Sequence, residues 1–436
     1  MRVLIISKEA WRDEQNGGNV LTNLFSPFSD VEFAQIYCNE QDPNNNVCKN
    51  YYQMTDKMMV NNIFYKQKVG REIIYEDYPT ETVARKESYR IKNTKCIGDL
   101  IRAVRELVWA LGQWDKNEII TFARRFDPDI IFAPCYGNHY MQRLTSIVHN
   151  AINVPVVSYI SDDFYTNRQF KLSPIFWLNH LLLRPRTRRT FRHYSLCYTM
   201  TDEQKEQCEE DFGANMKILR KSGRFEDRYL KQTVNTPIRI VYAGGIYLNR
   251  WRTLVALVNA MRSINIDGVK LVLDIYTNSE LNSKLCKVLN DGIISRVHKV
   301  IPMSELVEVY RNSDIALHAE AFDLKNSSTV RMSFSTKIVD CLDSGCAVMA
   351  ICDKKQAGGA YLRRNDCAIC INDLSALEPT LRELVDKPQI LINYQHRAFD
   401  LGRKNHLQKN ISKDLRDDFE ALMKNRNNER MYYREK

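Results

Sequence analysis

The chain has 436 residues, of which 44% are hydrophobic and 27% charged, and its formal net charge is +10. This composition is typical of a globular protein and excludes a disordered chain, while the length predicts two domains. No run of about 18 apolar residues is present, which excludes a membrane-spanning helix. The 12 cysteines, without a secretory signal segment before them, predict reduced core residues in a cytoplasmic protein.

The chain opens on a compact apolar run at residues 2–7, which predicts a buried strand. Gly17, Gly18 and Asn19 then open a helix, and glycines at such a place let a ligand approach the backbone closely. An ordinary turn is the alternative, because the GxGxxG fingerprint of dinucleotide-binding proteins is absent. Residues 31–38 predict the second strand of the same sheet.

Residues 96–125 predict one long helix, and the apolar run at 129–134 predicts a buried strand after it. His139 follows this strand and begins another helix. Asp162 and Asp163 follow the next predicted strand in the same way. Ligands of α/β proteins bind at the carboxyl ends of strands, so all three side chains are candidate site residues. A structural histidine and a helix-capping aspartate are the alternatives.

Residues 173–194 combine an apolar segment with five arginines and no acidic residue. Such a segment can dock on an anionic membrane, and the alternative is a surface helix with solvated arginines. The basic cluster lacks the interleaved aromatic residues and motifs of nucleic-acid-binding proteins, so we expect no nucleic-acid partner.

The composition becomes polar over residues 221–237, where we place a domain linker. Residues 238–247 then repeat the order of strand, glycines and helix. Gly244 and Gly245 permit close approach to the backbone, and Arg250 lies just before the helix. Apolar runs and helical patterns continue to alternate after this point, which predicts a second α/β domain.

The most informative stretch is 332–353, which predicts a loop, a short helix and a buried strand. Ser335 and Thr336 are good N-cap residues, and a helix N-terminus binds phosphate well. Lys337 lies in the first turn, where a cation opposes the helix dipole unless an anion binds there. Asp340 shares a face with Lys337 and is placed for sugar hydroxyls. The alternative is a surface helix with one Lys–Asp pair.

The order of elements predicts an α/β protein with two Rossmann-like domains whose parallel sheets face each other across a cleft. We expect the first domain at 1–220, the linker at 221–237 and the second domain at 238–394. The strongly helical tail at 395–436 has an apolar face, so we expect it to pack back on the first domain.

The chain resembles GT-B glycosyltransferases, specifically the glycosyltransferase family 4 type of bacterial polysaccharide assembly. The similarity runs in order through Gly17–Gly18, the stretch PDIIFAPCYGNH at 128–139, YAGGIYLNRW at 242–251 and FSTKIVDCLDSGCAVMA at 334–350. It implies transfer of a sugar from a nucleotide-diphosphate sugar to a hydroxyl of a saccharide or lipid-linked saccharide. It also implies retention of configuration, an acceptor-binding first domain and a donor-binding second domain. We expect no metal and no other cofactor.

The resemblance also implies roles for residues on the donor side. Gly244 and Gly245 would lie near the diphosphate, and Arg250 would neutralise it. Thr336 and Lys337, next to Ser335, would hold phosphate oxygens. Arg250 and Lys337 would act in catalysis by stabilising the charge of the leaving group.

Further roles concern the sugars. Asp340 would take the ribose hydroxyls, and Glu320 is a candidate carboxylate from the preceding strand. His139 would lie near the transferred sugar and Asp162 would face the acceptor, both as catalytic candidates. Asp163 and the glycine loop with Asn19 complete the acceptor side.

The sequence departs from the family pattern at two places. The family carries two glutamates eight residues apart, where this chain has Met332 and Asp340, and its arginine after the donor-domain glycine is Gly245 here. Two alternatives therefore stay open: a sugar-nucleotide epimerase or hydrolase of the same fold, and a non-catalytic nucleotide-sugar-binding protein. We expect a cytoplasmic location, and a peripheral position on the inner face of the membrane is also open.

Overall fold

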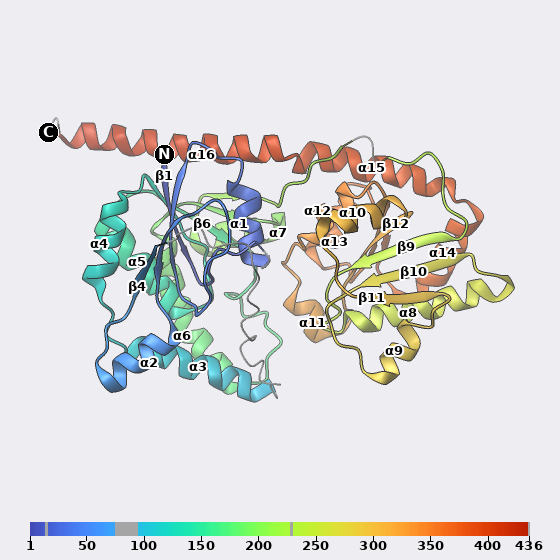
Figure 1. The fold of residues 1–436 in the computed structure, drawn as a ribbon, viewed down its shortest axis with the longest axis horizontal. Helices are drawn as coiled ribbons and strands as arrows, with labels where there is room; N and C mark the ends of the chain where they lie inside the picture. The colour runs from blue at the N-terminus through green and yellow to red at the C-terminus, as the bar shows by residue number, and fades with distance from the viewer. Residues whose placement is uncertain (14–15, 75–94, 227–229, 435–436) are drawn as a thin grey trace.

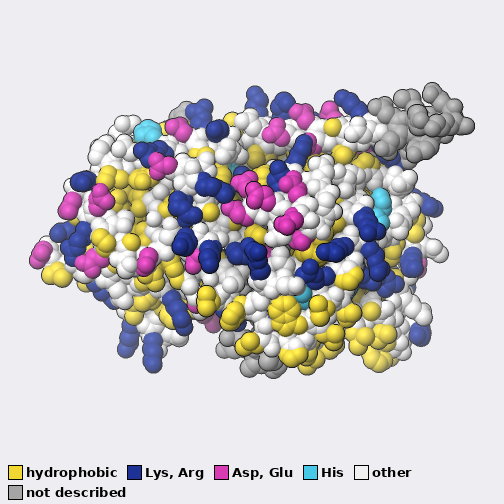
Figure 2. All heavy atoms as spheres, turned by 180° about the vertical axis from the view of Figure 1, so that it is seen from behind, with side chains coloured by type: hydrophobic (Ala, Val, Ile, Leu, Met, Phe, Trp, Pro, Cys, Tyr) yellow, Lys and Arg dark blue, Asp and Glu magenta, His cyan; other side chains and the backbone are white. Residues whose placement is uncertain are grey.

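The computed structural model describes residues 1–13, 16–74, 95–226 and 230–434, and they form two α/β units (Figure 1). Each unit is a mainly parallel sheet with helices on its faces, and a linker and two C-terminal helices connect the units. On the face seen from behind, basic side chains are scattered over both units (Figure 2).

The first unit contains an eight-stranded sheet in the order β4-β3-β2-β1-β5-β6-β7-β8. All neighbouring strands are parallel except β3 and β4, which pair antiparallel. The strands are β1 (Arg2–Ser7), β2 (Glu32–Tyr37), β3 (Asn50–Gln53), β4 (Arg71–Ile74), β5 (Ile130–Phe132), β6 (Val156–Ile160), β7 (Tyr194–Thr199) and β8 (Met216–Ile218). The helices are α1 (Asn16–Phe25), α2 (Asp56–Tyr65), α3 (Lys95–Leu111), α4 (Lys116–Phe126), α5 (His139–Ile152), α6 (Pro174–Phe191) and α7 (Asp202–Phe212).

The long helix expected over residues 96–125 is in fact two helices, α3 and α4. Asp115 ends the interruption, because its side chain accepts a hydrogen bond from the backbone N–H of Glu118 at 3.2 Å and caps α4. Trp114 is buried in the same interruption and donates its indole N–H to the carbonyl of Trp109 at 2.9 Å. The break therefore lets Trp109 of α3 and Ile119 and Phe122 of α4 enter the same core.

The second unit contains a six-stranded, wholly parallel sheet in the order β11-β10-β9-β12-β13-β14. This is the doubly wound order, in which the chain starts in the middle and reverses direction between β9 and β12. The strands are β9 (Ile238–Ala243), β10 (Leu271–Tyr276), β11 (Ser295–His298), β12 (Ile315–Ala319), β13 (Ala347–Ile351) and β14 (Ile369–Ile371). The helices are α8 (Arg250–Ile264), α9 (Ser283–Leu289), α10 (Met303–Arg311), α11 (Leu324–Thr329), α12 (Lys337–Asp343), α13 (Ala357–Arg364) and α14 (Leu377–Asp386).

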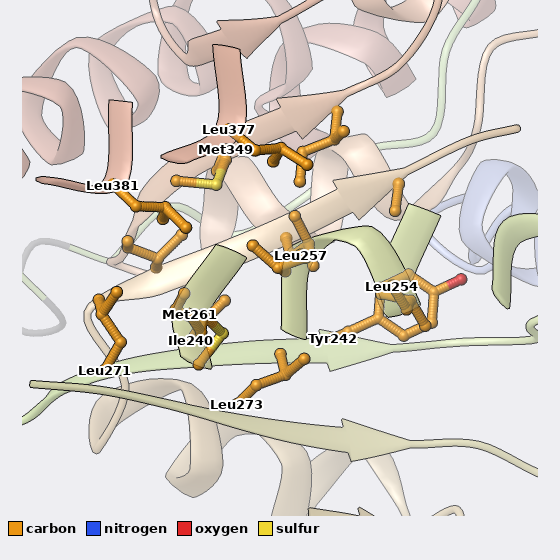
Figure 3. Packing of buried hydrophobic residues seen from close by; sticks show 14 of the residues in the cluster. Ile240, Tyr242, Leu254, Leu257, Met261, Leu271, Leu273, Met349, Leu377 and Leu381 are labelled. Carbon is orange, nitrogen blue, oxygen red and sulfur yellow. The ribbon is translucent and has the colours of Figure 1, made fainter. Parts of the chain in front are cut away.

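The core of the second unit forms where α8 and α14 pack on the sheet (Figure 3). Leu254, Leu257 and Met261 of α8 are fully buried against Ile240 and Leu271 of neighbouring strands. A parallel sheet covered on both faces requires strands that are apolar along most of their length. The apolar runs of the sequence meet this requirement. The places where these runs end determine where the strands end and where the loops at their carboxyl ends begin.

The two C-terminal helices, α15 (Gln389–His406) and α16 (Gln408–Arg434), contact different units. α15 packs on β13 and α12 of the second unit, so the domain end expected at residue 394 falls inside this helix. α16 runs along the first unit, where Leu415 and Phe419 are buried in its core (Figure 1). Tyr198 donates a hydrogen bond to Asp418 of α16 at 2.6 Å.

The chain crosses between the units twice, and the two crossings lie side by side. The backbone N–H of Gly223, in the linker, donates to the carbonyl of His406 at 2.9 Å. The N–H of Gln408 donates to the carbonyl of Gly223 at 3.1 Å. The start of the linker and the junction of α15 and α16 are therefore joined as a short parallel bridge.

The cysteines of the described part of the chain are free, and most are buried. Cys367 and Cys370 have CxxC spacing, but burial raises the pKa of Cys367 to about 12 and that of Cys370 to about 11. Such thiols are mostly protonated near neutral pH and therefore unreactive. Among the described helices, none combines the length and the apolar character needed to cross a bilayer.

Candidate functional site

The candidate donor site lies at the carboxyl ends of β9 and β12, the two adjacent strands between which the chain order reverses. Gly244 and Gly245 follow β9, and Arg250 begins α8 after them. Glu320 follows β12, and Lys337 is the first residue of α12. Such a switch point is where open α/β sheets bind ligands.

Lys337 extends from α12 over the loop after β9. Its Nζ occupies the position that a Cβ atom on Gly244 would take, and Gly244 has a φ of +157°. The same nitrogen lies 5.6 Å from the ring centroid of Tyr242. Burial, and then the positive charge of Arg250, lower the pKa of Lys337 to about 8. A buried ammonium that lacks an anionic partner among the described residues is suited to receiving one from a ligand.

Arg250 forms a two-point ion pair with Glu320. Its Nε lies 2.7 Å from Oε2 and its Nη2 lies 2.8 Å from Oε1. Both side chains are buried, and Thr253 donates to the Glu320 carbonyl at 2.7 Å. Burial lowers the pKa of Arg250, but the hydrogen bonds with Glu320 outweigh it and hold the pKa above its ordinary value. Glu320 is thus a partner of Arg250 rather than a free carboxylate for the sugar.

His318 of β12 is a site residue that sequence reasoning did not select. Its side chain is 3% exposed, and its Nε2 has no hydrogen-bond partner in the described part of the chain. Burial lowers the pKa of His318 to about 4, against the raising effect of Glu320. A neutral imidazole therefore lies within electrostatic range of Arg250 and Lys337. All residues of β12 are buried, so the sequence pattern of this strand does not distinguish a site histidine from a histidine of the core.

The start of α12 differs from the sequence prediction. Thr336 is the N-cap by position, but its backbone is helical and its side chain makes no capping hydrogen bond. Ser335 contributes its carbonyl, which accepts from the N–H of Ile338 at 2.9 Å. The expected side-chain capping by Thr336 is wrong, because a helical backbone at the cap turns the hydroxyl away from the free amides.

Asp340 forms an ion pair with Lys221 of the linker, with Nζ 2.5 Å from Oδ1. The Lys337–Asp340 pair considered as an alternative is not formed, and Asp340 is not a free carboxylate placed for ribose hydroxyls. Lys221 lies 119 residues away in sequence, so no local pattern could reveal this partner. The Lys221–Asp340 pair connects α12 to the linker between the two units.

On the acceptor side, His139 begins α5 as expected. Its contacts are with the first unit: Arg186 of α6 donates to its carbonyl at 3.1 Å, and Asn179 hydrogen-bonds to it as well. Burial lowers the pKa of His139, and nearby Glu106 opposes this effect. No described hydrogen bond or ion pair joins His139 to the donor-side residues.

Asp162 and Asp163 contact the second unit instead of standing free toward an acceptor. Asp162 accepts from the Ser333 hydroxyl at 3.2 Å, and Asp163 pairs with Arg331 at 3.0 Å. Asp163 also accepts from the N–H of Thr166 at 3.0 Å, but no helix begins there: the next helix is α6, which Ser173 caps, so the helix-capping alternative is wrong. These carboxylates therefore hold the loop before α12 against the first unit.

Gly17, Gly18 and Asn19 lie in the first turns of α1, which begins at Asn16. Further along this helix, Asn23 accepts from the N–H of Ser222 at 2.8 Å, so α1 adjoins the linker. The glycines thus open a helix as expected, and that helix contacts the crossing between the two units.

Similar solved structures cover nearly the whole chain. HepE from Anabaena in complex with UDP has a TM-score of 0.60 at 12% identity, covering 97% of this chain and 100% of that one. Sucrose-phosphate synthase from Thermosynechococcus elongatus has a TM-score of 0.60 at 10% identity, covering 97% and 98%. A UDP-forming α,α-trehalose-phosphate synthase from Burkholderia xenovorans with glucose-6-phosphate has 0.56 at 9%, covering 96% and 100%.

The sequence itself matches no protein-family model and no curated protein sequence. The likeness therefore concerns the arrangement of the backbone, at an identity too low to carry an activity over. Two doubly wound units, a linker and C-terminal helices that return to the first unit are all part of that arrangement. The chain has the GT-B fold of these glycosyltransferases.

Proposed function

We propose that the chain is a glycosyltransferase that moves a sugar from a nucleotide-diphosphate sugar to an acceptor hydroxyl. The observation that carries this proposal is the convergence of two cations, the buried Arg250 and the half-buried Lys337, at the switch point of the second sheet. The leaving group of such a transfer is a nucleoside diphosphate, whose negative charge grows as the bond to the sugar breaks. Preorganised cations in a water-poor site stabilise that charge strongly.

The two cations have different tasks in this proposal. Glu320 engages Nε and Nη2 of Arg250, and Tyr247 also hydrogen-bonds to this side chain, so the guanidinium is fixed in place where it can act on a phosphate oxygen. Lys337 has no such carboxylate and supplies the positive charge that the diphosphate neutralises. The lack of side chains at Gly244 and Gly245 lets Lys337 and Tyr247 lie close to the backbone of this loop. Ser335 and Thr336 line the start of α12. We infer that no metal ion is needed and that the sugar keeps its anomeric configuration, as in family 4 glycosyltransferases.

The solved structures support the class of donor. HepE is seen in complex with UDP, and the trehalose-phosphate synthase is UDP-forming. A UDP-sugar is therefore the first donor to test. The acceptor in this proposal is a saccharide or a lipid-linked saccharide of cell-surface polysaccharide synthesis, bound by the first unit near His139. The protein would act on the cytoplasmic side of the membrane and bind no nucleic acid.

The first experiment is a thermal-shift series with UDP, GDP, CDP, ADP and NAD on the wild type and on Lys337→Ala. A ligand at 100 times its Kd adds about 2.7 kcal/mol to the free energy of unfolding, which is a measurable shift. We expect a shift with one nucleoside diphosphate, unchanged by EDTA and lost in Lys337→Ala. A shift with NAD alone would contradict the proposal.

Transfer is tested separately with the matching nucleotide-sugar. Release of the nucleoside diphosphate that depends on an added acceptor supports the transferase, and the anomer of the product is read by NMR. Release without any acceptor would favour the hydrolase, and conversion of the donor into a different nucleotide-sugar would favour the epimerase. Binding without any turnover of the donor would favour the non-catalytic protein.

A further inference from the structure

Helix α3 turns an apolar stripe toward solvent. Four of its side chains, spaced at helical intervals on one face, are between 49% and 61% exposed; they are Leu100, Val104, Leu107 and Leu111. On its other face, Trp109 is fully buried in the core of the first unit. A surface helix of a globular protein normally turns its apolar stripe inward and its polar side outward. This helix is apolar on both sides, so its outer stripe needs a separate explanation.

The two helices that pack beside α3 extend the stripe into a wider surface. α2 ends with Phe64 and Tyr65, which are 73% and 72% exposed. α6 contributes three leucines between 60% and 63% exposed; they are Leu178, Leu181 and Leu182. The three helices lie together at one end of the first unit (Figure 1), and hydrophobic side chains gather at the corresponding edge from behind (Figure 2). We call this surface, made by residues 56–65, 98–111 and 174–191, the three-helix face.

The charge of the three-helix face is basic. The first half of α6 is apolar on its exposed side, and its second half exposes Arg186, Arg188 and Arg189. α6 has no acidic residue. Two acidic residues of the neighbouring helices are already paired: Asp56 lies 2.8 Å from Arg105, and Asp99 lies 3.2 Å from Arg102. Glu106 of α3 accepts from Asn138 at 2.9 Å.

We propose that the three-helix face binds the surface of an anionic lipid bilayer. Apolar side chains that reach past the helix backbone enter the boundary between headgroups and acyl chains, while arginines beside them bind anionic headgroups. Tyrosine and phenylalanine at the end of α2 suit the same boundary. A second copy of the chain would bring arginines against arginines, so charge favours lipid over self-association.

The three-helix face adjoins the acceptor side of the candidate site. Arg186 of α6 donates to the carbonyl of His139, the first residue of α5. If the proposed function holds, binding at this face brings the site to a sugar acceptor that is itself anchored in the bilayer. This last step rests on the proposed function, whereas membrane binding does not depend on it.

The test is co-sedimentation of the full chain with vesicles of phosphatidylcholine, with and without phosphatidylglycerol. We expect binding to the anionic vesicles that weakens at high salt, because headgroup attraction is screened. The variant Leu107→Asp/Leu111→Asp, and separately Arg189→Gln/Arg192→Gln, should each lower the partition coefficient at least about tenfold. Leu107 and Leu111 are exposed, so these changes leave the core untouched.

Matched controls come from the second unit. Ile293→Asp replaces an apolar side chain that is 64% exposed, and Lys284→Gln/Lys287→Gln removes two exposed cations from α9. Both should bind vesicles as the wild type does. Equal loss in the controls, or no binding to anionic vesicles by the wild type, would overturn the proposal. A wild-type dimer that Leu107→Asp/Leu111→Asp converts to a monomer would also overturn it, because the face would then join two copies. Transfer to a soluble acceptor, measured without vesicles, tests the proposed function independently.

Discussion

The Nζ atom of Lys337 fills the space beside Gly244 that any larger residue would claim with its Cβ atom. The resemblance to family 4 glycosyltransferases would place an arginine at position 245, where this chain has glycine. A lysine that reaches back from α12 thus brings a cation to the same loop from another element. Four predictions follow from this arrangement and from the buried groups around it.

Replacing Gly244 by alanine should displace the Lys337 side chain. A lost charge-assisted contact costs about 1.5–3 kcal/mol, so UDP affinity should fall about tenfold to hundredfold. Isothermal titration calorimetry measures this change. The control is Gly268→Ala: Gly268 has a φ of +116°, and a Cβ there meets nothing within 4 Å, so backbone strain is present without displacement. Equal affinities of the two variants would show that Lys337 does not bind the diphosphate.

Donor binding should decline at alkaline pH. Because burial lowers the pKa of Lys337 to about 8, its ammonium is charged below that pH and neutral above it. The UDP affinity should therefore be constant between about pH 7 and pH 8, where the terminal phosphate is fully ionised, and fall about tenfold per unit above it. Lys337→Arg keeps its charge, so its UDP affinity should stay nearly constant over the same alkaline range. Lys337→Ala should raise the activation barrier by about 2–4 kcal/mol, which is measured as a lower kcat/KM. An alkaline limb that survives in Lys337→Arg would assign the titration to another group.

Glu320→Gln should destabilise the unliganded protein. It leaves the buried charge of Arg250 without its partner, and breaking a buried ion pair costs about 3–5 kcal/mol. UDP should restore part of this loss, so its thermal shift should exceed that of the wild type. Urea unfolding provides the free energies. Glu378→Gln breaks an exposed pair with Arg382 and should cost less than about 1 kcal/mol. Similar losses in both variants would mean that the Arg250 pair is not a structural anchor.

Acid should weaken the fold through two buried histidines. Burial lowers the pKa of His318 to about 4 and that of His406 to about 4 as well. In the unfolded chain each binds a proton near pH 6.5, so the unfolded state gains protons first as pH falls from 6.5 to 4. The free energy of unfolding should decrease by about 2 kcal/mol per histidine between pH 7 and pH 5.

Gln substitutions separate the two contributions in urea unfolding at both pH values. Together the two histidines should lower the free energy of unfolding between pH 7 and pH 5. His318→Gln or His406→Gln alone should remove about half of that decrease. Exposed His396→Gln serves as the control and should leave the pH dependence as in the wild type. A loss of stability that persists in the double variant would place the acid sensitivity elsewhere.

Much of the fold could be predicted because buried parallel strands are apolar along their whole length. β1, β5, β9 and β13 show this pattern in the sequence, and the structure confirms them. β3, β4 and β8 were missed, since short strands such as NYYQ at or next to the edges of the sheet carry polar residues and no clear period. The two parallel sheets were predicted from the alternation of strands and helices, and the GT-B fold is confirmed by the similar solved structures.

The candidate site was less predictable, because its side chains are set by partners distant in sequence. Arg250, Lys337 and Gly244 could be selected from local patterns of loops and helix starts. That Glu320 pairs with Arg250 and Asp340 with Lys221 depends on how four loops meet in space. The roles of Asp162 and Asp163 at the contact between units likewise depend on Ser333 and Arg331, which no motif singles out.

The bridge between Gly223 and the junction of α15 and α16 limits how the two units can move. Both covalent connections between the units pass through this bridge, so we expect the units to move relative to each other by rotation about it. Lys221, which pairs with Asp340, is two residues from Gly223 in sequence, whereas Arg331 and Ser333 contact Asp163 and Asp162 of the first unit. We expect such a rotation to break the contacts of Asp162 and Asp163 with the second unit, while the Lys221–Asp340 ion pair, close to the bridge, stays formed.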